Sequence, residues 1–350
     1  MKILITGGAG YLGSVITGKL LNNGYKVTVL DKLIFNQVSL LSYTSNPNFK
    51  FIHGDVRNEK LLEKLCDEND VIIPLAAIVG FPACAAEPEL ADEINFKQIF
   101  DLVSRFQPDQ VVNAAAWTDV AGAESHMDLA SKVNTQGAIN IAKATSHFGA
   151  SLIQISTDYV FNGDFSKPIS EHQVQSPTNN YGLTKANAEI LLEKEFKSSV
   201  VVLRTAWLYG PGGKNFARTI ITKAVKATGE EISVVDDQWG QPTSSLDLAD
   251  KIVEIGEKGI THGIFHATNS GKTSWFEFAQ LLFSSAGLDS SILKSIKTSD
   301  FPTLVKRPVY SVLSHDGWDS TGIAPLRDWK LPVRELAAVI RREVEIEHGI

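Results

Sequence analysis

Residues 2–31 read KILITGGAGYLGSVITGKLLNNGYKVTVLD, and the order of elements in this stretch predicts the fold class. An apolar run, Lys2–Thr6, predicts a buried strand, and a second run, Lys26–Leu30, predicts another. Between them lie a glycine-rich turn and an amphipathic segment that predicts a helix through Leu21. Strand, glycine turn, helix and strand in this order open a Rossmann-type doubly wound parallel sheet. The expected fold class is therefore α/β.

The glycines of this turn have the spacing of a dinucleotide site. Gly8, Gly10 and Gly13 fit G-x-G-x-x-G, and a count from Gly7 fits G-x-x-G-x-x-G. Glycines permit a tight turn, and they let backbone amides at the start of the helix approach a pyrophosphate. The predicted cofactor-binding residues of the turn are Gly7, Gly10, Tyr11, Leu12 and Gly13.

Acidic residues at the ends of the next two predicted strands extend this cofactor site. Asp31 lies 18 residues after Gly13 (31 − 13), where a carboxylate can accept from the adenosine ribose and repel a 2′-phosphate. NAD(H) is therefore favoured, although Lys32 leaves room for NADP(H). Asp55 and Val56 follow a third predicted strand, where the acid can bind the adenine amino group. A helix N-cap at Asp55 is the alternative.

The composition limits the classes of function. With 350 residues and 38.2 kDa, the chain can bury a large core. The formal net charge of -7 argues against nucleic acid or an anionic membrane as a partner, and no apolar run approaches the ~20 residues of a membrane span. The 2 cysteines give no disulfide framework. We expect a soluble cytoplasmic protein, and we assign no metal ligands.

One predicted strand–helix unit occurs twice. Residues 109–134 repeat residues 70–95 without gaps at an offset of 39 (109 − 70). Each copy combines an apolar strand, an alanine-rich turn and an acidic helix, and chance similarity between two such units is the alternative explanation. A natural fusion and an engineered one give the same pattern.

The position of the two copies bears on the cofactor site. The second copy leads directly into the next predicted strand, so we expect it, rather than the first copy, beside the glycine-loop strand. Ala115 and Ala116 would then line the cofactor, unless Ala76 and Ala77 of the first copy take that place.

Residues 156–185, STDYVFNGDFSKPISEHQVQSPTNNYGLTK, carry the predicted chemistry. The apolar run before them predicts a strand that delivers Thr157 and Asp158 at its carboxyl end, where open α/β sheets bind ligands. Tyr181 and Lys185 lie four residues apart at the start of a predicted helix, so they share one helix face. An ammonium beside a phenol favours the phenolate. Thr157, Tyr181 and Lys185 are therefore the predicted catalytic residues, forming a proton donor for a carbonyl or alkoxide oxygen.

Strand and helix patterns continue beyond this stretch without a low-complexity linker. We expect residues 1–205 to form an NAD-binding Rossmann domain that includes the repeated unit. Residues 206–350 are expected to form mainly a smaller substrate-binding lobe, interleaved with the sheet.

The glycine turn, Asp31, Thr157, Tyr181 and Lys185 together resemble the extended short-chain dehydrogenase/reductase family. Residues 1–96, with GGAGYLG, HGDV and LAA, look like NAD-dependent nucleotide-sugar epimerases and dehydratases. From about Gln107 onward the chain is similar to dTDP-4-dehydrorhamnose reductases. The motifs of this second resemblance are VVNAAAWTDVAGAES, STDYVFNGD, PTNNYGLTK, RTAWLYG, KNFARTI, DDQWGQPTS, GIFHATNSGKTSW and KRPVYS.

The resemblance implies an oxidoreductase of dTDP-rhamnose biosynthesis, one that reduces the 4-keto group of a dTDP-4-keto-6-deoxyhexose with hydride from NAD(P)H. Tyr181 would protonate the sugar oxygen, and Thr157 would hydrogen-bond the same carbonyl. Lys185 would lower the pKa of Tyr181 and hold the nicotinamide ribose, which places both residues in the cofactor site as well. The implied substrate-binding residues are Asp158, Trp207, Asn215, Gln241 and Arg307. A homodimer follows by family analogy alone.

Two other functions stay open. A nucleotide-sugar 4-epimerase or 4,6-dehydratase would keep its NAD bound; against the dehydratase, Tyr159 follows Asp158 where that chemistry needs Glu. A chimeric or regulatory dinucleotide-binding protein with little turnover is the other alternative. The identity of the sugar does not follow from the sequence.

Overall fold

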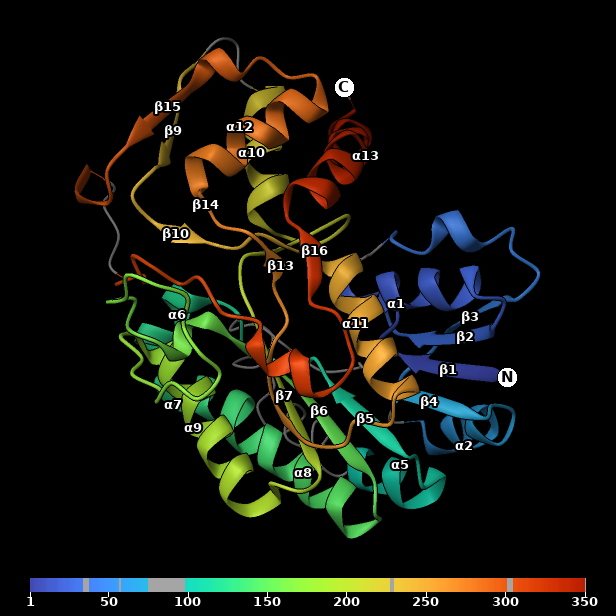
Figure 1. Ribbon diagram of the computed structural model, residues 1–350. Helices are drawn as coiled ribbons and strands as arrows, with labels where there is room; N and C mark the ends of the chain where they lie inside the picture. Colours follow the sequence, from blue (N-terminus) through green and yellow to red (C-terminus); the bar gives the residue numbers. More distant parts are fainter. Residues whose placement is uncertain (34–37, 57, 75–97, 227–229, 301–304, 350) are drawn as a thin grey trace. The chain divides into compact units, whose positions relative to one another are not determined.

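The computed structural model describes the chain except residues 34–37, 57, 75–97, 227–229, 301–304 and 350 (Figure 1). The chain divides into two compact units, each assembled from three segments. Unit 1 comprises Met1–Ser156, Asn179–Leu203 and Ile252–Ile264, and unit 2 comprises Thr157–Thr178, Arg204–Lys251 and Phe265–Ile350.

Unit 1 contains a four-stranded parallel sheet built on the glycine-loop strand. The strand order is β3-β2-β1-β4. Leu4 and Leu30 in this sheet are fully buried, because Leu65 of α2 and Leu102 of α5 pack against them. The elements are β1 (Lys2–Thr6), α1 (Tyr11–Asn22), β2 (Lys26–Asp31), β3 (Phe49–His53), α2 (Glu59–Asp67), β4 (Val71–Pro74) and α5 (Gln98–Phe106).

A second four-stranded sheet has the order β12-β7-β6-β5. Leu152 and Leu192, both 0% exposed, belong to the core between this sheet and its helices; burying an aliphatic side chain contributes ~1.5–3 kcal/mol. The boundary between the units falls inside β6, β7 and β12. The elements are β5 (Gln110–Asn113), α8 (Ala138–His147), β6 (Ser151–Thr157), α9 (Asn180–Phe196), β7 (Val200–Thr205) and β12 (Gly263–His266).

The expected position of the repeated unit is wrong. The strand of the first copy, β4, pairs with β1, so that Ile5 lies opposite Ile73. The strand of the second copy, β5, pairs with β6 and contacts β4. Consecutive strands of one sheet usually lie close together, and β4 is the first strand after β3 that can reach the free edge of β1. Both copies therefore enter unit 1, and Ala76 and Ala77 lie outside the described residues.

Unit 2 is organised around three helices that pack together (Figure 1). Their shared core includes Ile221, Phe278 and Ile340, all 0% exposed. The helices are α10 (Phe216–Lys226), α12 (Trp275–Ala286) and α13 (Lys330–His348). The strands are β8 (Leu208–Tyr209), β9 (Ile232–Val235), β10 (Trp239–Gly240), β11 (Thr243–Ser244), β13 (Asn269–Ser270), β14 (Thr273–Ser274), β15 (Leu293–Ile296) and β16 (Leu326–Asp328). Helix α11 (Ser245–Glu257) crosses the boundary between the units.

The predicted α/β class with a parallel Rossmann-type sheet is confirmed. The assignment of residues 1–205 to dinucleotide binding and of 206–350 to substrate binding stays a prediction. Among the described residues, no helix is long and apolar enough to cross a membrane.

Candidate active site

The turn between β1 and α1 requires glycine at particular positions. Gly7 has φ of 71°, a left-handed conformation that favours glycine. The Gly10 amide donates to the Gly7 carbonyl at 3.0 Å. A Cβ on Gly13 would lie 2.6 Å from the same carbonyl oxygen. Helix α1 begins at Tyr11 without an acidic residue in its first turn, so its positive end faces the glycines. These features fit a bound pyrophosphate.

The side chains of two predicted residues of this turn, Tyr11 and Leu12, lie outside the described part of the structure. Their backbone forms the first turn of α1. Helix N-termini present free amide donors, so the predicted contact with a pyrophosphate depends on this backbone.

Asp31 holds the glycine turn in place. Its Oδ2 accepts from the Ala9 amide at 2.9 Å and its Oδ1 accepts from the Leu33 amide at 2.8 Å. The residue is 9% exposed. A carboxylate has about four lone-pair sites, so each oxygen can still accept from a ribose hydroxyl.

The second acid of the predicted cofactor site, Asp55, pairs with a lysine. Its Oδ2 lies 2.9 Å from Lys32 Nζ. The alternative in which Asp55 caps the next helix is wrong, because α2 is capped by Asn58, whose Oδ1 accepts from the Leu61 amide. Val56 is half-buried against the core under β1. The predicted contacts of Asp55 and Val56 with adenine stay a prediction.

The alanine-rich turn after β5 is fixed by asparagine side chains. Ala115 and Ala116 are half-buried, and the Ala115 amide donates to Asn113 Oδ1 at 3.1 Å. The next residue, Trp117, is 0% exposed. Its amide donates to Asn134 Oδ1 at 2.8 Å, and its carbonyl accepts from Asn134 Nδ2 at 3.2 Å.

Asn134 also reaches the helix that carries the predicted catalytic pair. Its Nδ2 donates to Thr184 Oγ1 at 3.0 Å. Asn134 is 1% exposed and lies in a π-helical turn, η3 (Lys132–Gly137), which follows α6 (Val120–Ser125) and α7 (Met127–Ser131). Such turns are frequent at functional sites. Sequence reasoning assigned Asn134 no role, although its match to Asn95 at the end of the repeat was a usable signal.

Tyr181 and Lys185 lie in the first two turns of α9. The helix begins with an N-cap at Asn179, whose Oδ1 accepts from the Gly182 amide at 2.8 Å. Tyr181 is half-buried and packs against the cluster formed around Trp117. Lys185 is 3% exposed, and its Nζ donates to the Ile155 carbonyl of β6 at 2.7 Å.

The charge of Lys185 depends on two opposing effects. Burial lowers the pKa of Lys185 to about 8, and the Glu189 carboxylate one turn later opposes this change. Glu189 is 1% exposed and accepts from Ser156 Oγ. The ammonium is therefore the main form of Lys185 at neutral pH.

The predicted residues of unit 2 begin with Thr157 and Asp158. Thr157 Oγ1 donates to Asp158 Oδ1 at 3.1 Å and accepts from the Tyr159 amide at 3.2 Å. Asp158 is 2% exposed, and its Oδ2 has no hydrogen-bond partner among the described atoms. Burial raises the pKa of Asp158 to about 6, against hydrogen bonds from Ser311 and Thr157 that lower it. A buried acceptor without a partner is costly, which makes this oxygen a candidate contact for a ligand.

Trp207 packs inside unit 2. Its φ is 47°, a strained value for a non-glycine residue. Its ring stacks on Trp275 with 3.6 Å between centroids and an interplanar angle of 10°. Gly240 lies against the same indole, since a Cβ there would fall 2.4 Å from Trp207 Cε2. The predicted stacking of Trp207 on a hexose stays a prediction.

The remaining predicted substrate residues differ in how free their polar atoms are. Asn215 caps α10, with its Oδ1 accepting from the Arg218 amide at 3.0 Å. Gln241 is 2% exposed; its Oε1 accepts from the Leu313 amide and its Nε2 donates to the Leu313 carbonyl. Arg307 is exposed, and its charge lowers the pKa of Tyr159, which burial raises to about 12. Of the three residues, Arg307 alone is charged, and its exposed guanidinium is accessible to a diphosphate.

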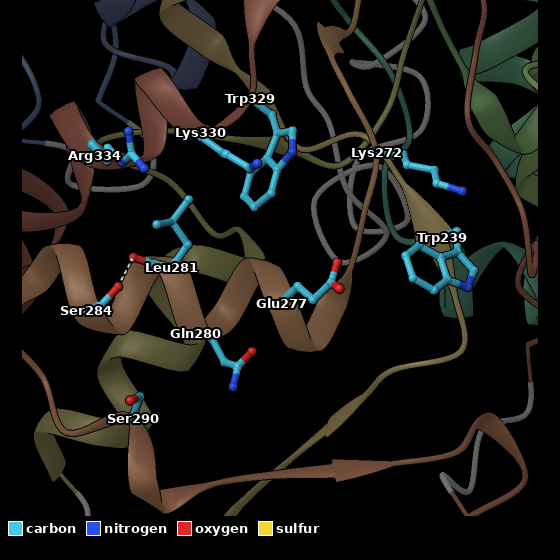
Figure 2. Close-up of a pocket in the computed structure, with 10 residues that line it drawn as sticks. All are labelled: Trp239, Lys272, Glu277, Gln280, Leu281, Ser284, Ser290, Trp329, Lys330 and Arg334. Carbon is cyan, nitrogen blue, oxygen red and sulfur yellow. Dashed lines mark hydrogen bonds between the residues drawn. The ribbon is translucent and has the colours of Figure 1, made fainter.

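Unit 2 also contains an open groove of about 720 Å³ beside α12 (Figure 2). Three cations line it, with Lys272 near Trp239 and with Lys330 and Arg334 at the start of α13. None of the predicted substrate residues belongs to its lining. Within the described ranges, no three His, Cys, Asp or Glu side chains gather in a way that could hold a metal ion.

The parallel sheet, the glycine turn and the Tyr–Lys helix define an extended short-chain dehydrogenase/reductase. Residues 96–342 match the family described as RmlD substrate binding domain, and residues 3–98 match the NAD dependent epimerase/dehydratase family. The first match covers more than half of the chain, so the chain belongs to the RmlD substrate binding domain family. The predicted change of resemblance between residues 96 and 107 is confirmed.

Named relatives agree with this family. The chain is 41% identical over 234 residues to a probable dTDP-4,6-dihydroxy-2-methyloxan-3-one 4-ketoreductase of Streptomyces antibioticus, covering 67% of this chain and 78% of the relative. It is 33% identical over 336 residues to the spore coat polysaccharide biosynthesis protein SpsK of Bacillus subtilis (strain 168), covering 95% and 96%. The crystal structure of dTDP-4-dehydrorhamnose reductase from Bacillus anthracis in complex with NADP is similar with a TM-score of 0.72 and 29% identity, covering 96% and 98%.

Proposed function

We propose that this chain reduces the 4-keto group of a dTDP-linked 4-keto-6-deoxyhexose with hydride from NAD(P)H. The observation that carries the proposal is the Tyr181–Lys185 pair on α9, whose lysine is buried and bonded to the Ile155 carbonyl. The names of the Streptomyces antibioticus and Bacillus anthracis relatives support the class of substrate.

Tyr181 is the proposed acid. It gives its phenolic proton to the carbonyl oxygen of the sugar as that carbon is reduced. The Lys185 ammonium stabilises the phenolate that forms, because a positive charge nearby favours the ionised phenol. The bond from Lys185 Nζ to Ile155 restricts where that charge lies. A positioned general acid is worth ~10²–10⁴-fold in rate.

The glycine turn is the proposed site of the dinucleotide pyrophosphate, and a bound NAD(P)H supplies the hydride. We expect NAD(H) to be preferred, since Asp31 is ready to accept from ribose hydroxyls and would repel a 2′-phosphate. The pairing of Lys32 with Asp55 supports this preference, because that ammonium is engaged away from Asp31. The ratio of kcat/KM for NADH and NADPH measures it.

In unit 2, Thr157 and Asp158 are proposed to bind the sugar. The Thr157 hydroxyl can turn its proton from Asp158 to the carbonyl oxygen of the substrate. Asp158 Oδ2 then accepts from a sugar hydroxyl, which supplies the partner that this buried oxygen lacks among the described atoms. Trp207 and Arg307 are the proposed contacts for the rest of the nucleotide sugar. The sugar contacts of Asn215 and Gln241 stay predictions, because both side chains already hydrogen-bond protein groups.

The test mixes purified protein with dTDP-4-keto-6-deoxy-L-mannose and follows NADH absorbance. We expect stoichiometric loss of NADH with the wild-type chain and a loss of rate of at least ~10²-fold for Tyr181→Phe. Tyr25→Phe, one residue before β2, is the matched control and should react normally. If the Tyr181→Phe variant keeps the wild-type rate, Tyr181 is not the acid.

A 4-epimerase is the second candidate, and the match of residues 3–98 to the NAD dependent epimerase/dehydratase family favours it. An epimerase keeps its cofactor through the cycle. NAD released only after denaturation, together with no net consumption of NADH, would establish this function instead.

The homodimer expected by analogy is part of the proposal. Light scattering of the purified protein measures its mass against the 38.2 kDa of one chain; a single-chain mass would reject it.

A further inference from the structure

The structure gives the two copies of the repeated strand–helix unit different partners. The first copy supplies β4, which pairs with β1 next to the glycine turn. The second copy supplies β5, which pairs with β6. The strands β4 and β5 contact each other, although no ladder joins them among the described residues. Each is an edge strand of its own sheet.

The connections to the Tyr–Lys helix come from the second copy. Asn134 binds both backbone groups of Trp117 and also the Thr184 hydroxyl. The Thr184 hydroxyl in turn donates to the Tyr181 carbonyl at 2.8 Å. The alanine turn of the second copy and the proposed acid therefore belong to one hydrogen-bonded network.

The first copy keeps an asparagine, Asn95, at the position of Asn134, but it lacks two side chains of the second copy. At the offset of 39, Ile78 stands where the second copy has Trp117, and Gly80 stands where it has Asp119. Asp119 caps α6 through the Gly122 amide, and glycine has no side chain for that bond. The copy beside the glycine turn is thus the one that lacks these two side chains.

The second copy is compatible with pairing to β1. In the observed register Leu4 and Ile5 lie opposite Ile72 and Ile73, and the corresponding residues of β5 are the apolar Val111 and Val112. Asn113 replaces Pro74, so the strand would gain an amide that can join the ladder.

An aspartate precedes the strand in both copies. Asp70 Oδ2 accepts from the Lys2 amide at 2.8 Å, and the Asp70 amide donates to the Lys2 carbonyl at 2.9 Å. Asp109 holds the same position in the second copy. The anchor of β4 at the start of β1 is therefore available to β5.

We propose that residues 70–108 are an inserted duplicate that keeps the glycine-loop strand one strand away from the Tyr–Lys network. We further propose that β5 pairs with β1 when this duplicate is absent. Neighbouring strands lie ~4.8 Å apart, so removal brings the second alanine turn and α9 closer to the glycine turn by about that distance. The two sheets then join into one, with the order β3-β2-β1-β5-β6-β7-β12.

Two deletions of equal size test this proposal. Deletion of residues 70–108 joins Asn69 to Asp109 and keeps the second copy; deletion of residues 96–134 joins Asn95 to Thr135 and keeps the first. Each removes 39 residues. We expect the first variant to fold, with a melting temperature at least equal to that of the full chain. We expect the second variant to lose the Trp117 contacts and to melt lower.

Turnover gives the second readout, and this part rests on the proposed function. Misplacement of reacting groups by 1 Å can cost ~10²-fold in rate, so the variant without residues 70–108 should gain at least ~tenfold in kcat/KM over the full chain. The variant without residues 96–134 should lose activity. The proposal is overturned if the full chain is active and the folded variant without residues 70–108 shows no gain in kcat/KM over it.

Point variants of the full chain decide the matter if both deletions fail to fold. Proline inside a strand removes a ladder donor. Ile73→Pro should then lower the melting temperature less than Val112→Pro, because β5 can take the place that β4 leaves. The reverse order overturns the proposal.

These folding measurements do not need a substrate. Loss of the proposed reductase activity, with the predicted order of melting temperatures preserved, would reject the function and leave the inference on the duplicate standing.

Discussion

Two buried polar residues, Lys185 of unit 1 and Gln241 of unit 2, have different kinds of partners. In unit 1, the Lys185 ammonium donates to the Ile155 carbonyl, and burial lowers the pKa of Lys185 to about 8. In unit 2, Gln241 has its amide oxygen and nitrogen bonded to the backbone of Leu313, and its oxygen also accepts from Thr268. The first arrangement leaves a charge that can act on a neighbour, whereas the second fixes a loop. A buried polar residue of a family motif can therefore have a catalytic or a structural role, and its hydrogen-bond partners distinguish the two.

The largest expected effect concerns Lys185. Lys185→Met removes the charge that favours the Tyr181 phenolate, and we expect kcat to fall by ~10²–10⁴-fold. Steady-state NADH oxidation measures it. Lys143→Met on α8, an exposed position, is the matched control. Retained activity in Lys185→Met would mean that Lys185, like Gln241, has a structural role.

The pH dependence sharpens the same contrast. The folded pKa of Lys185 is lowered to about 8, so the ammonium predominates below that pH and is lost as pH rises through it. We expect kcat to decrease above pH ~8. Lys185→Arg keeps its charge at every accessible pH, so its residual activity should lack this decrease. An identical alkaline limb in both proteins would assign the titration to another group.

Gln241→Leu should show the opposite behaviour from Lys185→Met. It leaves the Leu313 amide and carbonyl without their side-chain partner, while the Thr268 hydroxyl keeps its hydrogen bond with His315 Nε2. Each buried group without a partner costs ~1–3 kcal/mol. We expect a loss of about 3 kcal/mol in the free energy of unfolding, measured by urea denaturation, with KM for the sugar changed little. Gln173→Leu, at an exposed position, should cost almost nothing. A raised KM at unchanged stability would return Gln241 to the substrate site.

Gly13→Ala tests whether the turn of unit 1 is shaped for a ligand. The added Cβ would lie 2.6 Å from the Gly7 carbonyl oxygen, so the turn must open. We expect KM for NADH to rise at least ~tenfold, since backbone amides at such turns bind the pyrophosphate. Gly137→Ala is the control, because the added Cβ would lie 3.6 Å from its nearest neighbour, the Lys132 carbonyl oxygen. Equal effects of both changes would mean that the crowding at Gly13 is unrelated to the cofactor.

The smallest effect is expected at Asn215. Asn215→Ala removes the side-chain cap of α10, and loss of a cap costs ~1 kcal/mol. Asn58→Ala removes the corresponding cap of α2 and should cost a similar amount in thermal unfolding. A role of Asn215 in substrate binding would add a rise in KM for the sugar that Asn58→Ala lacks.

Features that depend on neighbours in the sequence could be predicted. The glycine turn, the end of β2 at Asp31 and the spacing of Tyr181 and Lys185 all follow from local patterns, and the structure places them on the expected elements. The two family matches, at residues 3–98 and 96–342, also agree with the motifs. Short-range spacing is enough for such inferences because backbone geometry and helix periodicity fix the outcome.

Features that depend on distant partners could not be predicted. The strands β4 and β5 have the same apolar pattern, so this pattern does not decide which of them pairs with β1. Asn134 acts on Thr184, 50 residues away, and no local pattern announces that contact. Trp207 packs on Trp275 and Gly240. The motif that contains Trp207 does not specify these two partners.

The division of unit 1 into three stretches of chain affects how the protein is made. Its last stretch ends at Ile264, after about three-quarters of the 350 residues. Nascent domains fold as their residues leave the ribosome. The end of α11 and the start of β12 belong to unit 1 and are synthesised after its other segments. Unit 1 therefore cannot be completed on the ribosome before almost half of unit 2 has been synthesised, so folding of the two units overlaps in time instead of proceeding from one end of the chain to the other.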